Sequence, residues 1–276
     1  MTFLNILYGL LVGLSLGLTG GGGAIFAVPL LVYGLEVSPR EAVAVSLAAV
    51  GATSFVGFLH RWKLGEVEIR TGLLFALAGM LGAPLGAWLA GFVPDAILLL
   101  AFGVLMIVVA LRLWQQASRP AAAITDCPPS GTNDRSACHR DASGTLILTS
   151  RCAILLLAVG VLTGLLSGLF GVGGGFVIVP ALVLFSSMTI HRAVGTSLMV
   201  IALVSLSGVT SQFLSGRAVP LEVTVLFVAG GIGGLFVGQQ IGRRLSGPTL
   251  QKVFALAILA VATFVITRNL LSYTQT

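Results

Sequence analysis

Apolar stretches long enough to cross a lipid bilayer recur along almost the whole chain. They are roughly 16 to 25 residues long, and a helix needs about 20 apolar residues to cross the hydrocarbon core. Only 9% of the 276 residues are charged and 57% are hydrophobic, whereas about 25% of an ordinary soluble domain is charged. Outer-membrane barrels alternate apolar and polar residues in segments of about 10, and this sequence lacks that alternation. We therefore expect an all-α, polytopic transmembrane bundle.

Charged, proline and glycine positions divide the chain into ten apolar segments. They cover residues 3–18, 24–35, 42–59, 71–92, 96–114, 152–170, 176–188, 193–214, 221–242 and 249–267. The second and the seventh are only about 13 residues long and cover about 20 Å as helices, less than the roughly 30 Å of the hydrocarbon core. We expect these two segments to be half-helices or re-entrant pieces.

A polar region separates the first five segments from the last five. Residues 115–150 contain Pro120, Pro128, Pro129 and a mixture of Ser, Asp, Arg and Gly, a composition that cannot bury a core. The sequence therefore predicts a first transmembrane repeat at 1–116, a linker at 117–150 and a second transmembrane repeat at 151–276.

The two halves repeat one another when they are aligned with an offset of 151 positions. Identical residues then coincide: Gly13, Gly17, Gly20, Gly22, Gly23, Val28 and Pro29 fall on Gly164, Gly168, Gly171, Gly173, Gly174, Val179 and Pro180. The offset also pairs Ser46 with Ser197, and after one inserted residue Gly79 and Gly82 meet Gly231 and Gly234. Because five segments per half is an odd number, the second copy enters the membrane from the opposite side, which predicts an inverted repeat.

The basic residues predict the orientation of the chain in the membrane. With ten crossings, one side collects twelve of the 15 cations: Arg61, Lys63, Arg70, Arg112, Arg119, Arg135, Arg140, Arg151, Arg192, Arg243, Arg244 and Lys252. The other side holds Arg40, Arg217 and Arg268. The positive-inside rule then places the linker in the cytoplasm and both termini outside. Re-entrant hairpins at the short segments give the same count, whereas merging each short segment with its neighbour weakens the bias to 10 against 5.

Each half contains a run of glycines that is expected to interrupt a helix. The runs are Thr19 to Gly23 and Gly171 to Gly175. Glycine permits positive φ angles, and a helix that restarts after a break offers N–H groups and a positive dipole end to an anion. The predicted substrate-binding residues here are Thr19, Gly20, Gly22, Gly23, Gly171, Gly173, Gly174 and Gly175. Glycines also let membrane helices pack closely, which is the preferred reading for Gly13, Gly17, Gly164 and Gly168.

Polar residues inside the apolar segments are the remaining candidates, because each needs a partner in a medium without water. Substrate contacts are predicted for Ser46, Thr196, Ser197 and Gln212, although serine and threonine often bond only to their own helix. Further donors on the same helices are Thr53, Ser54, Ser205, Ser207, Thr210 and Ser211. Gln212, Gln239 and Gln240 are expected to face the protein interior. Arg61 either binds anion oxygens bidentately or anchors the chain at the cytoplasmic surface.

The charged residues indicate the class of substrate. The acidic residues Glu36, Glu41, Glu66, Glu68, Asp95 and Glu222 all flank apolar segments, whereas cation transporters usually place carboxylates inside the membrane. Neutral donors without embedded carboxylates suit an anion. The basic residues lie in short loops and form no single patch, so no nucleic-acid partner is expected.

No cofactor, resident metal or catalytic activity is expected. The sequence contains neither a nucleotide-binding G-x-x-x-x-G-K-[ST] run nor an H-E-x-x-H pair. Cys127, Cys138 and His139 share the polar linker, but their spacing matches no compact zinc pattern. An odd count of three cysteines argues against a disulfide framework.

The doubled motif resembles the TauE/SafE family of sulfite and organosulfonate exporters. It reads GLSLGLTGGGG at 13–23 and GLLSGLFGVGGG at 164–175, followed by Pro29 and Pro180, with AVGTSL at 193–198 and His60-Arg61 before Gly65. The resemblance implies ATP-independent export of small sulfur-containing anions such as sulfite or sulfoacetate through an inner membrane. The first half reads Ala-Val-Ser at 44–46 where the second reads Gly-Thr-Ser at 195–197, so the two halves need not contribute equally to the site.

The leading hypothesis is a transporter that binds a small sulfite or sulfonate anion between the two breaks. An anion channel or a permease for other organic anions would use the same donors. A membrane enzyme or assembly factor would need an embedded nucleophile, a metal cluster or a large soluble domain, and the sequence shows none. A coupling proton or ion and a homodimeric state are left open.

Overall fold

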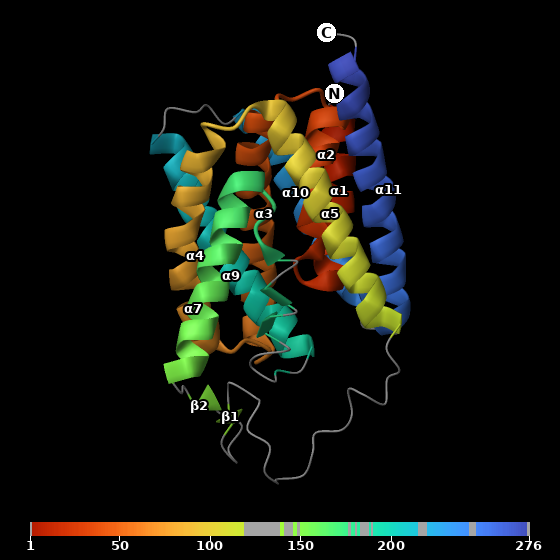
Figure 1. The fold of residues 1–276 in the computed structure, drawn as a ribbon. Coiled ribbons are helices and arrows are strands. Elements are labelled where there is room, and N and C mark those ends of the chain that lie inside the picture. Colours follow the sequence, from red (N-terminus) through yellow and green to blue (C-terminus); the bar gives the residue numbers. More distant parts are fainter. Residues whose placement is uncertain are drawn as a thin grey trace.

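The chain folds into a bundle of long helices that lie side by side (Figure 1). The structure is a computed structural model and describes residues 2–118, 139–140, 146–147, 150–175, 178–179, 181–182, 188, 190–214, 220–242 and 247–274. The elements in chain order are α1 (Thr2–Thr19), the 3-10 helix η1 (Gly22–Phe26), α2 (Ala27–Pro29), the π-helix η2 (Leu30–Gly34), α3 (Pro39–Lys63), α4 (Ile69–Ala90), α5 (Asp95–Ser118), β1 (His139–Arg140), β2 (Leu146–Ile147), α7 (Ser150–Phe170), α9 (Ile190–Leu214), α10 (Leu221–Gly242) and α11 (Gly247–Thr274).

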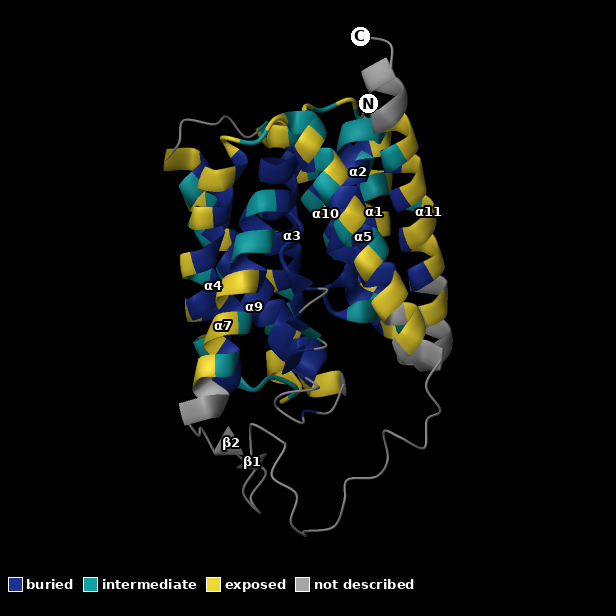
Figure 2. Cartoon of the chain, in the orientation of Figure 1, coloured by how far each residue is buried: buried dark blue, intermediate teal, exposed yellow. Residues whose placement is uncertain are grey.

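Five of these helices are long and apolar enough to cross a membrane. They contain the spans Pro39–Lys63, Ile69–Ala90, Asp95–Arg112, His191–Leu214 and Leu221–Gly242. Large apolar side chains such as Leu81 and Phe213 are exposed on the outside of the bundle at 70% and 74%, while buried residues gather between the helices (Figure 2). An outer surface this apolar suits lipid, so the predicted all-α polytopic bundle is confirmed.

Glycines bring the backbones of two helix pairs into direct contact. A Cβ atom built on Gly13 of α1 would lie 1.9 Å from the carbonyl oxygen of Gly231 in α10. One built on Gly164 of α7 would lie 2.1 Å from the carbonyl oxygen of Gly79 in α4. Because Gly13 and Gly164 are repeat-equivalent, the same contact is made twice. The expectation that these glycines serve close helix packing is confirmed.

The equivalent helices α3 and α9 run in opposite directions through the centre of the bundle. Gly51 of α3 faces Ser205 of α9, and Gly57, further along α3, faces Leu198, which comes earlier in α9. The start of α1 and the end of α11 lie at one end of the bundle, and the end of α5 and the start of α7 lie at the other (Figure 1). The equivalent helices α3 and α9 are thus antiparallel, while the inverted relation of the complete halves stays a prediction.

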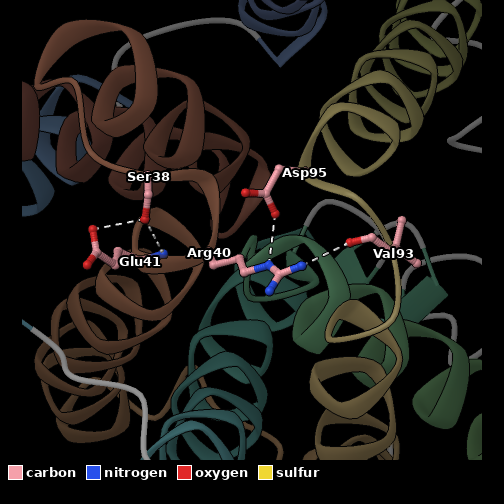
Figure 3. Close-up of polar contacts among 5 residues, drawn as sticks. All are labelled: Ser38, Arg40, Glu41, Val93 and Asp95. Atoms are coloured by element: carbon pink, nitrogen blue, oxygen red, sulfur yellow. Dashed lines mark hydrogen bonds and ion pairs between the residues drawn. The ribbon is translucent and has the colours of Figure 1, made fainter.

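The start of α3 shows how the chain begins one of its two long buried helices. Ser38 caps the helix: its hydroxyl accepts a hydrogen bond from the N–H of Glu41 at 3.4 Å and donates to the Glu41 carboxylate at 2.9 Å. Pro39 occupies the first helical turn, where its missing N–H costs nothing. Arg40 pairs with Asp95 of α5 at 2.8 Å (Figure 3). Both side chains are 44% exposed, so the ion pair contributes at most about 1 kcal/mol and mainly joins the starts of α3 and α5.

Several sequence expectations fall outside the described residues. Cys127, Cys138, Pro180 and most of segment 176–188 are among them. The three domain boundaries and the side of the membrane that each end faces stay predictions.

The backbone contacts predict a sharp position dependence for glycine substitutions. Gly13→Ala and Gly164→Ala should each lower the thermal unfolding midpoint of the detergent-purified protein, because overpacking costs about 1–3 kcal/mol. Gly233→Ala in α10 is the control, since nothing lies within 4 Å of its added methyl group. Equal midpoints for all three variants would show that these glycine contacts do not hold the helices together.

Candidate functional site

Both predicted helix interruptions are present, and each is a turn made by glycines. Helix α1 ends at Thr19, and Gly20 and Gly21 follow with φ angles of 72° and 154°. Helix α7 ends at Phe170, and the φ angles of Gly171, Gly173 and Gly174 are 71°, 68° and 68°. Residues with a Cβ rarely adopt these angles. The prediction that the glycine runs break the helices is therefore confirmed.

After the first break the chain returns alongside α1. A Cβ on Gly23 would lie 2.2 Å from the Ser15 side chain, and one on Gly34 would lie 2.5 Å from the ring of Tyr8. The residues contacted on α1 thus move back toward its start. The short segment, made of η1, α2 and η2, is a re-entrant piece of the kind predicted, and Pro29 ends α2 within it.

The two breaks touch each other in the middle of the bundle. A Cβ on Gly21 would lie 2.6 Å from the Cα of Gly175, and a Cβ on Gly175 would lie 2.5 Å from the Cα of Gly21. Any side chain at either position would separate the breaks. The bundle therefore brings together the two glycine runs, which are 151 residues apart in the sequence.

A reciprocal pair of hydrogen bonds holds each break against the other half of the chain. The Ser197 hydroxyl of α9 donates to the carbonyl oxygen of Gly20 at 2.6 Å. The Ser46 hydroxyl of α3 donates to the carbonyl oxygen of Gly171. Both serines are fully buried. These two predicted binding residues meet the breaks, but their hydroxyl hydrogens are engaged by the chain itself in this conformation.

The serine positions also give the depth of the breaks. Ser46 lies seven residues after Pro39, where α3 begins, and Ser197 lies seven residues after Ile190, where α9 begins. At 1.5 Å per residue, each break lies about 10 Å inside the end of a long helix. The α1 hairpin therefore turns inside the bundle and not at its surface.

Several N–H groups of the glycine runs are also bonded within the chain. Those of Gly20 and Gly171 donate to the carbonyls of Leu16 and Ser167 at 2.7 and 2.8 Å. The N–H of Gly23 donates to the Thr19 hydroxyl at 3.2 Å. These three groups stabilise the turns in this conformation and are not available to a ligand.

Three predicted site residues make other contacts or lie further along their helix. Arg61 forms a 2.7 Å ion pair with Glu66 in the α3–α4 loop, and its side chain is only 7% exposed. Thr196 accepts a hydrogen bond from the N–H of Glu68 at 3.0 Å, so it holds the same loop. Gln212 is buried, as expected, but it lies fifteen residues beyond Ser197 on α9, which is about 22 Å along the helix.

Four other buried side chains carry a polar atom that has no hydrogen-bond partner in the described part of the chain. They are the hydroxyls of Ser54, Ser167 and Ser205 and the amide nitrogen of Gln239. A buried polar group without a partner is costly, and unexplained cases in native structures often mark functional sites.

Two of these groups lie close to a break, and the residue that carries a third packs against α1. The Ser205 hydroxyl lies 3.7 Å from the position of a Cβ on Gly173. Ser167 belongs to the last turn of α7, directly before the second break. The backbone nitrogen of Gln239 lies 2.9 Å from a Cβ on Gly17, near the end of α1.

Sequence reasoning recognised these four residues only in part. Ser54 and Ser205 stood among the further donors, and Gln239 was correctly expected to face the interior. The same expectation for Gln240 is wrong, because that residue is exposed; it follows Gln239 directly on α10 and therefore points to another side of the helix. The offset of 151 that makes Ser54 and Ser205 equivalent was the available signal.

The polar groups around the breaks are neutral. Glu41, Asp95 and Glu222 occupy first helical turns, Glu68 precedes α4, and within the described ranges no three His, Cys, Asp or Glu residues gather as metal ligands. Hydroxyl and amide donors can bind an anion but offer little to a metal cation.

A separate cavity of about 410 Å³ lies between α1, the re-entrant segment and α11. Its lining residues are Leu11, Ser15, Phe26, Pro29, Leu30, Tyr33, Gly34, Val261 and Phe264. It contains none of the four unpartnered polar groups and no charged side chain. This apolar cavity does not suit a small anion.

Comparison with known proteins finds related chains over nearly the full length. Residues 5–265 match the model of the family described as sulfite exporter TauE/SafE. A probable membrane transporter protein of Xylella fastidiosa (strain 9a5c) is 36% identical over 264 residues, which cover 94% of this chain and 92% of the relative. The probable membrane transporter protein YunE of Bacillus subtilis (strain 168) is 27% identical over 263 residues, with 93% and 94% covered. No solved structure matches the chain significantly.

The reciprocal serine bonds predict that Ser46→Ala and Ser197→Ala destabilise the protein. Each substitution leaves a buried glycine carbonyl without its donor from the other half, at a cost of about 1–3 kcal/mol. Thr210→Ala on α9 is the matched control, because that exposed hydroxyl donates only to Leu206 of its own helix at 2.7 Å. Thermal unfolding of the three purified variants compares the effects. Serine variants no less stable than the control would contradict a stabilising role for the two serine hydrogen bonds.

Proposed function

The chain belongs to the TauE/SafE sulfite exporter family, and on this basis we propose that it is a secondary, ATP-independent exporter of small sulfur-containing anions such as sulfite, sulfoacetate or other organosulfonates. The protein is a multi-pass integral membrane protein and a membrane transporter. The proposal adds the substrate class, the outward direction, the absence of ATP coupling and a location in the bacterial inner membrane, with the linker cytoplasmic and both termini outside.

One observation carries the proposal. Two helix breaks, one from each half of the sequence, touch at Gly21 and Gly175, with buried neutral donors beside them. Secondary transporters place substrate between such broken helices near the middle of the membrane. Sulfite and sulfonates present several oxygen atoms that accept hydrogen bonds, so hydroxyl, amide and backbone N–H groups match them without a fixed positive charge.

Alternating access requires the touching breaks to separate. The backbone contacts suggest which parts move together, because α1 is held by α10 and α4 is held by α7 through glycines with no side chain between them. Each pair contains one helix from each sequence half. We therefore assign the motion to two bodies, one built on α1 and α10 and the other on α4 and α7, that rock against each other. In this proposal Ser46, Ser197 and the glycine runs lie where the two bodies meet.

An anion channel is the rival function, since it would use the same donors. Transport measured in proteoliposomes separates the two. A transporter should show sulfite or sulfoacetate flux that saturates with concentration and exceeds chloride flux, with no flux of a neutral analogue. Flux that rises linearly with concentration would favour the channel, and the absence of sulfite and sulfonate flux would reject the proposed substrates.

The contact between the breaks predicts a transport defect without loss of the fold. Gly21→Leu should abolish flux, because a side chain at this position, with a φ angle of 154°, meets the Gly175 backbone. Gly233→Leu is the control, since nothing lies within 4 Å of a Cβ there. Gel filtration checks that both variants remain folded, and normal flux through folded Gly21→Leu protein would exclude the breaks from the transport path.

A further inference from the structure

Ser54 and Ser205 are buried hydroxyls for which the described part of the chain offers no partner. Their exposures are 0% and 1%. A serine in a helix can turn its hydroxyl to the carbonyl three or four residues earlier. Neither Ser54 nor Ser205 makes that bond here.

Neighbouring hydroxyls on the same two helices behave differently. Ser207 on α9 donates to the carbonyl oxygen of Met80 in α4 at 2.8 Å, and Thr210 donates within its own helix. Ser46 and Ser197 bond to the opposite break. On α3 and α9, the buried hydroxyls without a partner in the described part of the chain are those of Ser54 and Ser205, and the Ser167 hydroxyl on α7 shares this property.

The two serines flank the crossing of α3 and α9. The Ser205 side chain lies 2.7 Å from a Cβ on Gly51. Ser54 comes three residues after Gly51 on α3, and residues three apart share a helix face. Because the Ser205 hydroxyl also lies 3.7 Å from a Cβ on Gly173, this crossing is next to the second break.

The repeat relates the two serines to each other. The offset of 151 that aligns the glycine runs carries Ser54 onto Ser205. Inverted halves therefore place one hydroxyl of the same kind on each side of the axis between them. A substrate held at the axis would meet the same donor from either half, whichever side of the membrane the site faces.

We propose that Ser54 and Ser205 form a symmetric pair of hydrogen-bond donors for the oxygen atoms of the transported sulfite or sulfonate group. This inference rests on the proposed function and adds two binding residues to it. Each hydroxyl donates to a different oxygen of the anion, and in doing so gains the partner that the chain does not supply. The pair favours an anion with several oxygens over chloride, which has only one atom to share.

The test measures sulfite flux in proteoliposomes for Ser54→Ala, Ser205→Ala, the double variant and Ser207→Ala. Each single serine variant should raise the half-saturating sulfite concentration about tenfold, the loss expected for one hydrogen bond to a charged group. The double variant should raise it further, and Ser207→Ala should leave it near the wild-type value. Wild-type half-saturation in the double variant, or an equal loss in Ser207→Ala, overturns the inference.

Thermal unfolding with and without sulfite separates binding from folding. Without sulfite, Ser54→Ala and Ser205→Ala should unfold at the wild-type temperature or above, because each removes a buried hydroxyl that lacks a partner. With the same sulfite concentration, the wild type and Ser207→Ala should gain more stability than Ser54→Ala and Ser205→Ala. If Ser54→Ala and Ser205→Ala lower the unfolding temperature without sulfite, the two hydroxyls have a structural role and the proposed donor pair is rejected.

The wild type distinguishes the two levels of the proposal. If it carries neither sulfite nor a sulfonate, the proposed function fails. The serine variants are then assayed with whichever anion the wild type does carry, chosen from sulfate, phosphate and acetate. A selective loss in the Ser54 and Ser205 variants would retain the donor pair for that oxyanion, whereas unchanged transport would remove it.

Discussion

Backbone polar groups inside a membrane must find partners within the protein, and the rest of this structure depends on how the two helix breaks meet that requirement. An open turn in hydrocarbon would expose carbonyl and N–H groups at a cost of several kcal/mol each. Here the carbonyls of Gly20 and Gly171 receive hydroxyl hydrogens from Ser197 and Ser46 of the opposite half. Each break receives this hydrogen bond from the other half, so packing the two halves together stabilises both turns.

The same requirement determines how the helices are arranged. For each break to reach the other half, the long helices α3 and α9 cross in opposite directions at the centre, and the hairpin that begins with α1 turns about 10 Å inside the bundle. The glycine contacts of α1 with α10 and of α4 with α7 let the helices approach closely enough for this geometry. Packing and hydrogen bonding thus support each other, and both kinds of contact occur at equivalent positions of the two halves.

A protein that transports must be able to undo part of this arrangement. Backbone contacts between glycines have no side chains to rearrange, so the α1–α10 and α4–α7 pairs are the parts least able to separate. The serine bonds are single interactions that water or a substrate oxygen can replace. We therefore expect the serine hydrogen bonds, where the proposed substrate binds, to break during transport. The α1–α10 and α4–α7 contacts should stay intact.

The sequence predicted the helices and the location of the breaks closely. The expected segments 42–59, 193–214 and 221–242 correspond to α3, α9 and α10, because their apolar length alone identifies membrane helices. The glycine runs predicted turns because the positive φ angles found at Gly20 and Gly171 disfavour other residues. The same reasoning was less successful for Gln240, which is exposed. Thr196 and Arg61 hold the α3–α4 loop in this conformation, and their part in substrate binding stays a prediction.

By itself, the sequence determined that this chain is a membrane protein with two related halves, each interrupted by glycines, because hydropathy, repeat spacing and backbone freedom are properties of the residues alone. Only the tertiary structure decided which hydroxyls bond to the other half of the chain and which remain without a partner in the described residues. Ser46 and Ser54 are alike as residues on one helix, yet one bonds to Gly171 and the other to nothing in the described chain. That difference depends on what lies opposite each hydroxyl, and the opposing groups come from the other half of the chain.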